Sequence, residues 1–240
     1  MKVFWFGDSW AAGSELPYTT SNYRGQLKDR FLTHKSEDCL LPDFKKSAKR
    51  YRPDLAFPAL ITEQLNLDSY YYVQGGASAN TFYSWLIDSI KDFEVKDSIA
   101  IFSLPTTWKR YEYINNDNVL CKNSLTENSE LIYRVQLERG YYDTTILLNL
   151  LYHVCIANRI TPYFFCCWQK VKTIESLNLI PKENFFFPLT TTLVDLSWES
   201  SVVGKVNPDI YPNEGHPNVE GQQKLARTLL PYVKNALLMK

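Results

Sequence analysis

Two short segments at opposite ends of the chain carry residues that could perform acyl-transfer chemistry. Near the start, the apolar run Val3 to Phe6 reads as a buried strand and leads directly into Gly7-Asp8-Ser9. Near the end, His216 precedes a segment with an apolar stripe at helical spacing. A serine at the carboxyl end of a strand can act as a nucleophile, and a histidine at a loop-to-helix junction can act as its general base. Taken alone, Gly7-Asp8-Ser9 is more typical of an ordinary turn at the end of a strand.

Taken together, the two segments resemble the SGNH/GDSL hydrolase family. Members of that family carry Gly-Asp-Ser near the N-terminus and Asp-x-x-His-Pro near the C-terminus. This chain reads Gly7-Asp8-Ser9-Trp10 at one end and Asn213-Glu214-Gly215-His216-Pro217 at the other. The resemblance implies that Ser9 is the nucleophile of an acyl-enzyme mechanism and that His216 is its general base.

The sequence departs from the family at the residue that orients the histidine. Asn213 stands three residues before His216, where the family has an aspartate. An asparagine can orient an imidazole, but it cannot stabilise the imidazolium by charge. The sequence leaves three ways to orient His216: the side chain of Asn213, the carboxylate of Asp209 and a backbone carbonyl.

The oxyanion hole that the resemblance implies is only partly represented. Its backbone donors would be the N–H groups of Ser9 and Gly76, because Gly75-Gly76-Ala77-Ser78 follows the apolar run Tyr70 to Val73. The family's Gly-x-Asn-Asp block should follow the next strand, and it is absent. Loss of one oxyanion donor typically costs about 3 kcal/mol of transition-state stabilisation. The candidates for a third donor are Thr106, Thr107 and Asn80.

Apolar segments with the spacing of strands alternate with segments of helical spacing, which is typical of a parallel sheet covered by helices on both faces. We expect strands near 2–6, 70–73, 98–103 and 162–168, and a fifth in about 183–194. We expect helices over 53–65 and 78–93, two helical stretches in 128–158, and a closing helix from near Asn218. The predicted fold class is α/β, a three-layer α/β/α sandwich with a parallel, flavodoxin-like sheet, as the resemblance also implies.

The chain is long enough for one domain, and we expect a single domain over 1–240 with insertions at about 17–52 and 104–127. Both insertions leave from carboxyl ends of predicted strands, so they would roof the same face of the sheet. The basic residues of 17–52 suit either a solvated loop or a rim that receives an acidic glycan. The aromatic and asparagine residues of 104–127 suit either a carbohydrate or a structural loop.

Composition sets limits on location and partners. The net charge is +0, so we expect neither nucleic acid nor membrane as a partner, and no segment has the eighteen apolar residues of a membrane span. The five cysteines include the adjacent pair Cys166-Cys167, which we expect to be buried and reduced. No pattern predicts a metal or cofactor.

We expect a cytoplasmic protein without a signal peptide. The segment 103–110 also resembles a phage and bacterial branch of the family, and a phage protein would be virion-associated.

The sequence therefore predicts a serine esterase that hydrolyses acyl esters, most simply O-acetyl groups, on a small molecule or a carbohydrate. Two alternatives stay open. One is a binding module for a glycan or protein that has the same fold and weakened catalysis. The other is an O-acyltransferase, in which a sugar hydroxyl replaces water as the acyl acceptor. The sequence does not indicate the oligomeric state.

Overall fold

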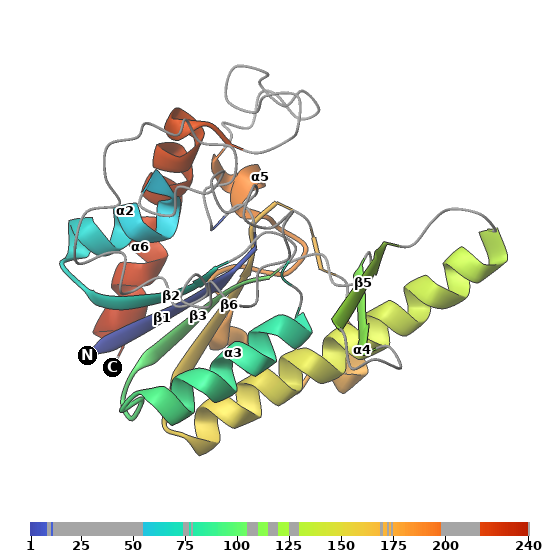
Figure 1. Ribbon diagram of the computed structural model, residues 1–240. Coiled ribbons are helices and arrows are strands. Elements are labelled where there is room, and N and C mark those ends of the chain that lie inside the picture. The colour runs from blue at the N-terminus through green and yellow to red at the C-terminus, as the bar shows by residue number, and fades with distance from the viewer. Residues whose placement is uncertain are drawn as a thin grey trace.

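The computed structural model describes residues 1–8, 11, 55–73, 77, 79–104, 110–114, 120–124, 130–168, 170, 171, 173, 175–197 and 217–239. The main sheet has four strands in the order β2-β1-β3-β6, and every pair is parallel (Figure 1). Its strands are β1 (Lys2–Gly7), β2 (Asp68–Val73), β3 (Ile99–Leu104) and β6 (Thr161–Cys166). This is the strand order of a flavodoxin-like sheet, which confirms the predicted fold class.

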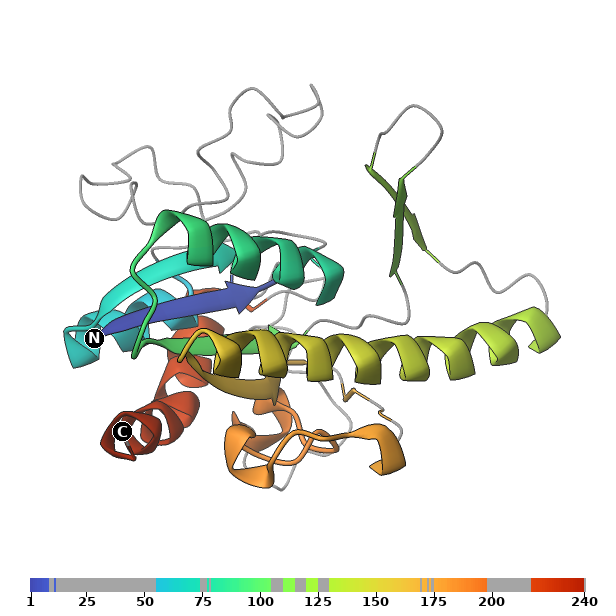
Figure 2. The same cartoon turned by 90° about the horizontal axis from the view of Figure 1, so that it is seen from below.

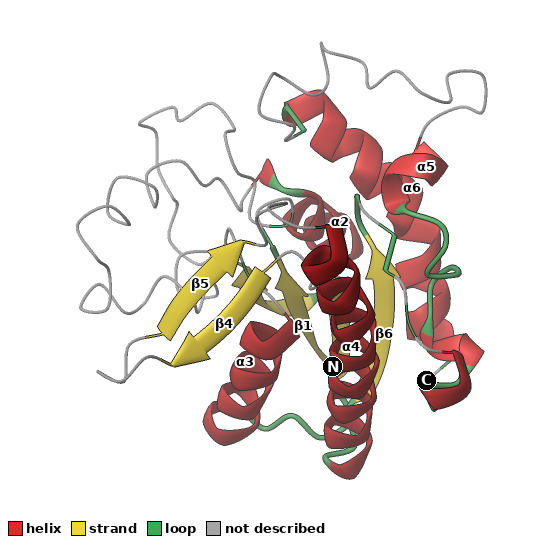
Figure 3. Cartoon of the chain, turned by 90° about the vertical axis from the view of Figure 1, so that its right-hand side faces the viewer, coloured by secondary structure: helices red, strands yellow, loops and turns green. Residues whose placement is uncertain are grey.

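The sheet is buried on both faces because its strands are apolar at successive positions. Val3 and Trp5 of β1 belong to a core cluster formed with α2 (Phe57–Leu65) and α6 (Val219–Leu238). Phe4 and Phe6 point the other way, into a cluster formed with α3 (Ala79–Asp92) and α4 (Glu130–Ala157). Helices on both faces of one sheet make the three layers that the sequence predicts (Figure 3).

A row of aromatic rings crosses all four strands one residue before β1 ends. Phe6 stacks on Tyr72 of β2 with ring centroids 5.3 Å apart and on Phe102 of β3 at 4.7 Å. Phe102 stacks in turn on Phe164 of β6 at 5.0 Å. The four rings sit on paired register positions, so they tie the strands together close to their carboxyl ends. The residues that follow these strands therefore start from a rigid platform.

The long helix α4 corrects one expectation. Two helical stretches were predicted over 128–158, whereas the structure has a single helix of 28 residues, Glu130–Ala157. Gly140 lies inside it. A glycine in a helix interior costs about 1 kcal/mol relative to alanine and does not end a helix that lacks proline. Figure 2 shows the first half of α4 extending beyond the sheet.

The fifth strand predicted in 183–194 is also wrong. Phe185 and Thr192 each form one isolated parallel bridge, to Phe164 and Cys166 of β6, and no strand connects them. Pro188 lies between them and has no N–H to donate to a ladder. This stretch instead contains short helical turns: η6 (Glu175–Leu177), η7 (Lys182–Asn184) and α5 (Leu193–Ser197).

Part of the predicted insertion at 104–127 forms a separate two-stranded antiparallel sheet. Its strands are β4 (Arg110–Ile114) and β5 (Leu120–Ser124), and they stand away from the main sheet (Figure 2). Sequence patterning did not identify them as strands. The other predicted insertion, 17–52, lies outside the described residues.

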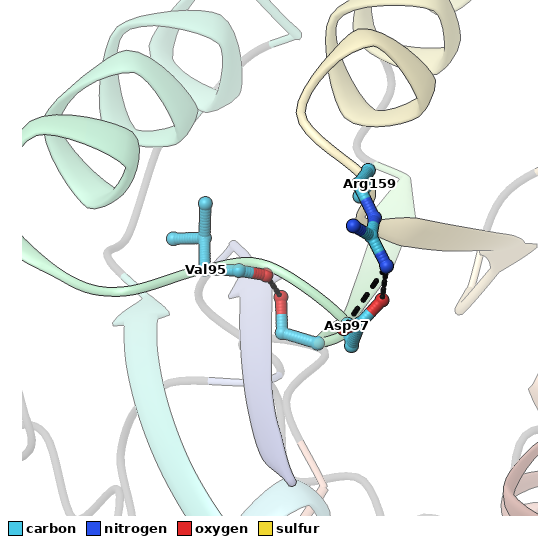
Figure 4. A network of polar contacts seen from close by, with 4 residues as sticks. Val95, Asp97 and Arg159 are labelled. Atoms are coloured by element: carbon cyan, nitrogen blue, oxygen red, sulfur yellow. Dashed lines mark hydrogen bonds and ion pairs between the residues drawn. The ribbon is translucent and has the colours of Figure 1, made fainter.

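At the amino edge of the sheet, a network of polar contacts joins the turns that precede β3 and β6. The Asp97 N–H donates to the Arg159 carbonyl at 2.9 Å, and the Arg159 guanidinium pairs with the Asp97 carboxylate at 2.9 Å (Figure 4). The Ser98 hydroxyl donates to the Val95 carbonyl in the same network. Both side chains of the ion pair are more than half exposed, so the pair adds little to stability. This network lies at the opposite edge from Asp8.

Candidate functional site at the carboxyl edge of the sheet

The end of β1 is packed so tightly that only glycine fits at position 7. A Cβ atom on Gly7 would collide with the Cβ of Ala11, while Val73 and Ser103 lie at ordinary contact distances of 3.5 and 3.6 Å. The reason for this glycine is steric: Ala11 occupies the space that a side chain at position 7 would need.

Asp8 follows Gly7 and is buried, with 3% of its surface exposed. Its carboxylate accepts a hydrogen bond of 3.0 Å from the indole Nε1 of Trp168. Trp168 lies two residues beyond the end of β6, so this bond passes over the end of β3, which lies between β1 and β6. Asp8, the residue before Ser9, is therefore bonded to the segment that follows β6, two strands away in the sheet.

Cys167, the residue before Trp168, is fully buried. Burial raises the pKa of the Cys167 thiol well above its usual range, and the nearby Asp8 carboxylate raises it further, while the Ser103 hydroxyl acts in the opposite direction. Cys155 and Cys166 are also buried and free, and burial raises the pKa of the Cys166 thiol to about 12. Such thiols stay protonated near neutral pH, so none of the three has the character of a nucleophile.

The residues that follow His216 in the sequence lead into the start of α6. The N-cap of α6 is Asn218, whose side-chain oxygen accepts from the Gly221 N–H at 2.9 Å. Gln222 in the next turn is completely buried, and its Oε1 accepts from the Phe57 N–H at 2.9 Å. Because the N-cap of α2 has no side-chain hydrogen bond of its own, Gln222 caps α2 from another helix.

The path of α6 shows which edge of the sheet its beginning occupies. The end of α6 lies toward the amino edge of the sheet, the edge where β1 begins, and α6 runs along the sheet to reach it (Figures 1 and 3). Pro217 and Asn218, where α6 begins, are therefore at the carboxyl edge, as Asp8 is. The structure thus brings the residues next to Ser9 and His216 to one edge of the sheet.

The elements around the predicted oxyanion hole end or begin at this same edge. β2 ends at Val73, Ala77 is buried, and α3 begins at Ala79. β3 ends at Leu104, directly before the segment with the two candidate threonines. Asn80 lies in the first turn of α3, as predicted, and its side chain is outside the described residues. The other predicted site residues outside the described residues are Ser9, Gly76, Thr106, Thr107, Asp209, Asn213 and His216.

Sequence reasoning missed two residues that build this edge. Trp168 was predicted only as the last residue of a strand, and Gln222 was not singled out. A polar or amphipathic residue just after a parallel strand was the available signal for Trp168. A lone glutamine amid an apolar helical face was the signal for Gln222.

The described part of the chain contains no cluster of three or more His, Cys, Asp or Glu side chains that could hold a metal ion. Among the same residues, no helix is both long and apolar enough to cross a membrane.

No family model and no curated protein matches this sequence. Solved structures match over nearly the whole chain. A carbohydrate esterase whose active site is described as having divergent catalytic and non-catalytic binding functions is 14% identical, with a TM-score of 0.53, over 97% of this chain and 68% of that one. A protein of Desulfitobacterium hafniense assigned to the G-D-S-L lipolytic family is 12% identical, with a TM-score of 0.48, over 96% and 98%.

A third match is an acetyl xylan esterase from the rumen bacterium Butyrivibrio proteoclasticus. It is 14% identical, with a TM-score of 0.45, over 98% of this chain and 64% of that chain. The match with a TM-score of 0.53 shows that this chain shares its fold with a carbohydrate esterase.

Proposed function

We propose that this protein is a serine ester hydrolase in which Ser9 attacks the ester carbonyl and His216 takes its proton. The observation that carries the proposal is topological: β1 ends two residues before Ser9, and α6 begins three residues after His216, at the same edge of one parallel sheet. In open α/β sheets this edge is where ligands bind. The fold shared with a carbohydrate esterase supports the proposal.

In the proposed mechanism the Ser9 hydroxyl oxygen forms a bond to the acyl carbon as His216 takes the hydroxyl proton. The backbone N–H groups of Ser9 and Gly76 donate to the developing oxyanion, with a third donor from Thr106, Thr107 or Asn80. The protonated His216 gives its proton to the leaving alcohol. Water, deprotonated by His216, then attacks the acyl-enzyme; the bond from the acyl carbon to the Ser9 oxygen breaks, His216 returns the proton to that oxygen, and the acid is released. Asn213 or Asp209 holds the imidazole in position.

The substrate we propose is an O-acetyl ester, on a small molecule or a carbohydrate. The segment 104–127, which leaves from the end of β3 and includes Trp108, Tyr111 and Tyr113, suits the stacking of a sugar ring. A protein with Asn213 in place of the family aspartate would also serve as a glycan-binding module, or as a transferase that passes the acetyl group to a sugar hydroxyl.

The test is turnover of 4-nitrophenyl acetate by the parent protein and by Ser9→Ala, with and without a sugar acceptor. The matched control is Ser98→Ala, which removes a buried serine hydroxyl at the opposite edge of the sheet. We expect hydrolysis by the parent and by Ser98→Ala, and none by Ser9→Ala. Turnover that requires the acceptor would identify a transferase, and no turnover by the parent would favour the binding module.

A further inference from the structure

We infer that Trp168 is a positioning residue for Ser9, and that it acts through the carboxylate of Asp8. The inference rests on the proposed function, because it concerns how the proposed nucleophile is held. It starts from the 3.0 Å hydrogen bond between the indole Nε1 of Trp168 and Oδ2 of Asp8.

The bond connects two parts of the site edge that are distant in the sequence. Asp8 is the residue before Ser9, and consecutive Cα atoms are only 3.8 Å apart. Asp8 is only 3% exposed and its carboxylate is bonded to an N–H, so it has little freedom and the position of the next residue is restricted as well. A shift of the nucleophile by 1 Å can cost on the order of 100-fold in rate.

The donor end of the bond is fixed independently. Trp168 packs on the core cluster shared by the sheet, α2 and α6. The residue before it, Cys167, is fully buried, and its carbonyl accepts from the Val194 N–H of α5 at 3.0 Å. The indole is thus held by packing and by its neighbour's backbone, and it can act as a fixed point for Asp8.

A second tryptophan shows that an indole N–H is not needed for packing in this core. Trp5 of β1 is 1% exposed, and its Nε1 has no hydrogen-bond partner among the described residues. Trp5 serves through its ring alone, against Phe57 at 6.5 Å between centroids. The indole N–H of Trp168, in contrast, donates to the carboxylate of Asp8, the residue before Ser9. This bond distinguishes a positioning role from a packing role.

The experiment compares Trp168→Phe with Trp5→Phe, which make the same chemical change at the two sites. For each variant we would measure kcat and KM on 4-nitrophenyl acetate, the rate of covalent labelling by a fluorophosphonate, and the thermal unfolding midpoint. We expect Trp168→Phe to lower kcat and the labelling rate together by about 10- to 100-fold, with KM nearly unchanged. Trp5→Phe should lower the unfolding midpoint and leave both rates at the parent values.

The variant Asp8→Asn tests whether the effect of Trp168 passes through Asp8. If Trp168 acts through Asp8, adding Asp8→Asn to Trp168→Phe should lower kcat less than Asp8→Asn does in the parent protein. Equal rates for Trp168→Phe and the parent would overturn the inference, as would equal losses of kcat in Trp168→Phe and Trp5→Phe. A parent protein that neither labels nor hydrolyses any ester would overturn the proposed function and this inference with it, whereas a labelled parent with an unaffected Trp168→Phe would overturn the inference alone.

Discussion

Gly7→Ala adds one methyl group at the point where the chain leaves β1, and its effect can be worked out from three contacts. The new Cβ would overlap the Cβ of Ala11, and neither atom can rotate away, because each is attached directly to the backbone. The next neighbours, Cγ1 of Val73 and Cβ of Ser103, would be 3.5 and 3.6 Å away and would not resist. The substitution must therefore push the segment that contains Ser9 away from the sheet.

Overpacking of this kind costs about 1–3 kcal/mol of unfolding free energy. For a chain of this length the unfolding midpoint falls by about 2–4 °C per kcal/mol, so Gly7→Ala should lower it by roughly 2–12 °C. Ester hydrolysis should fall as well, because the displaced segment carries Ser9. Denaturant unfolding followed by fluorescence and circular dichroism measures the first effect, and turnover of 4-nitrophenyl acetate measures the second.

Ala11→Gly is the control that isolates the collision. Alone it removes a methyl group from a residue that is 2% exposed, at a cost of about 1–2 kcal/mol from lost burial and greater backbone freedom. In that background Gly7→Ala should cost less than about 0.5 kcal/mol, because the space is now open. An equal cost of Gly7→Ala in both backgrounds, or no cost in either, would refute the steric explanation of this glycine.

Three further predictions concern the helix starts and the buried thiols. Gln222→Met leaves the buried Phe57 N–H without its acceptor, so denaturant unfolding should show a loss of about 1–3 kcal/mol. Asn218→Ala removes the N-cap of α6 and should cost about 1 kcal/mol, whereas Asn218→Asp keeps an acceptor and should stay near the parent value. The pKa of the Cys166 thiol is raised from 9.0 to about 12, and those of Cys155 and Cys167 are raised too, so the folded state holds these protons more tightly than the unfolded state. Their contribution to stability is complete below pH 9, and above it the free energy of unfolding should fall by up to about 1.4 kcal/mol per pH unit for each thiol. Urea unfolding of the parent and of Cys155→Ala from pH 8 to 11 would measure the slope of unfolding free energy against pH. Equal slopes for the two proteins would contradict this prediction.

The four strands of the main sheet could be predicted because each is a nearly continuous apolar run that needs cover on both faces. β1 illustrates this, since Val3, Trp5, Phe4 and Phe6 are all buried, two on each face. Local sequence also predicts the start of α6, where Asn218 is a good N-cap. These are properties of short segments, and they need no knowledge of distant contacts.

The parts that could not be predicted depend on contacts between distant residues. The hydrogen bond from Trp168 to Asp8 joins residues 160 positions apart, and the one from Phe57 to Gln222 joins residues 165 positions apart. No local pattern specifies either bond. The continuity of α4 through Gly140 was missed for a different reason: the small intrinsic penalty of one glycine does not end a helix that lacks proline. The predicted assignments of Ser9, His216 and the oxyanion donors stay predictions.

The central claim is that Ser9 is the nucleophile, and covalent labelling followed by peptide mapping tests it most directly. The parent protein, Ser9→Ala and His216→Ala would each be treated with a fluorophosphonate and analysed by mass spectrometry. We expect one adduct per chain, located on Ser9 in the parent protein, absent from Ser9→Ala, and formed at least 100-fold more slowly in His216→Ala, on the order of the contribution of a general base. An adduct on another residue, or equal labelling of the parent protein and Ser9→Ala, would contradict the account.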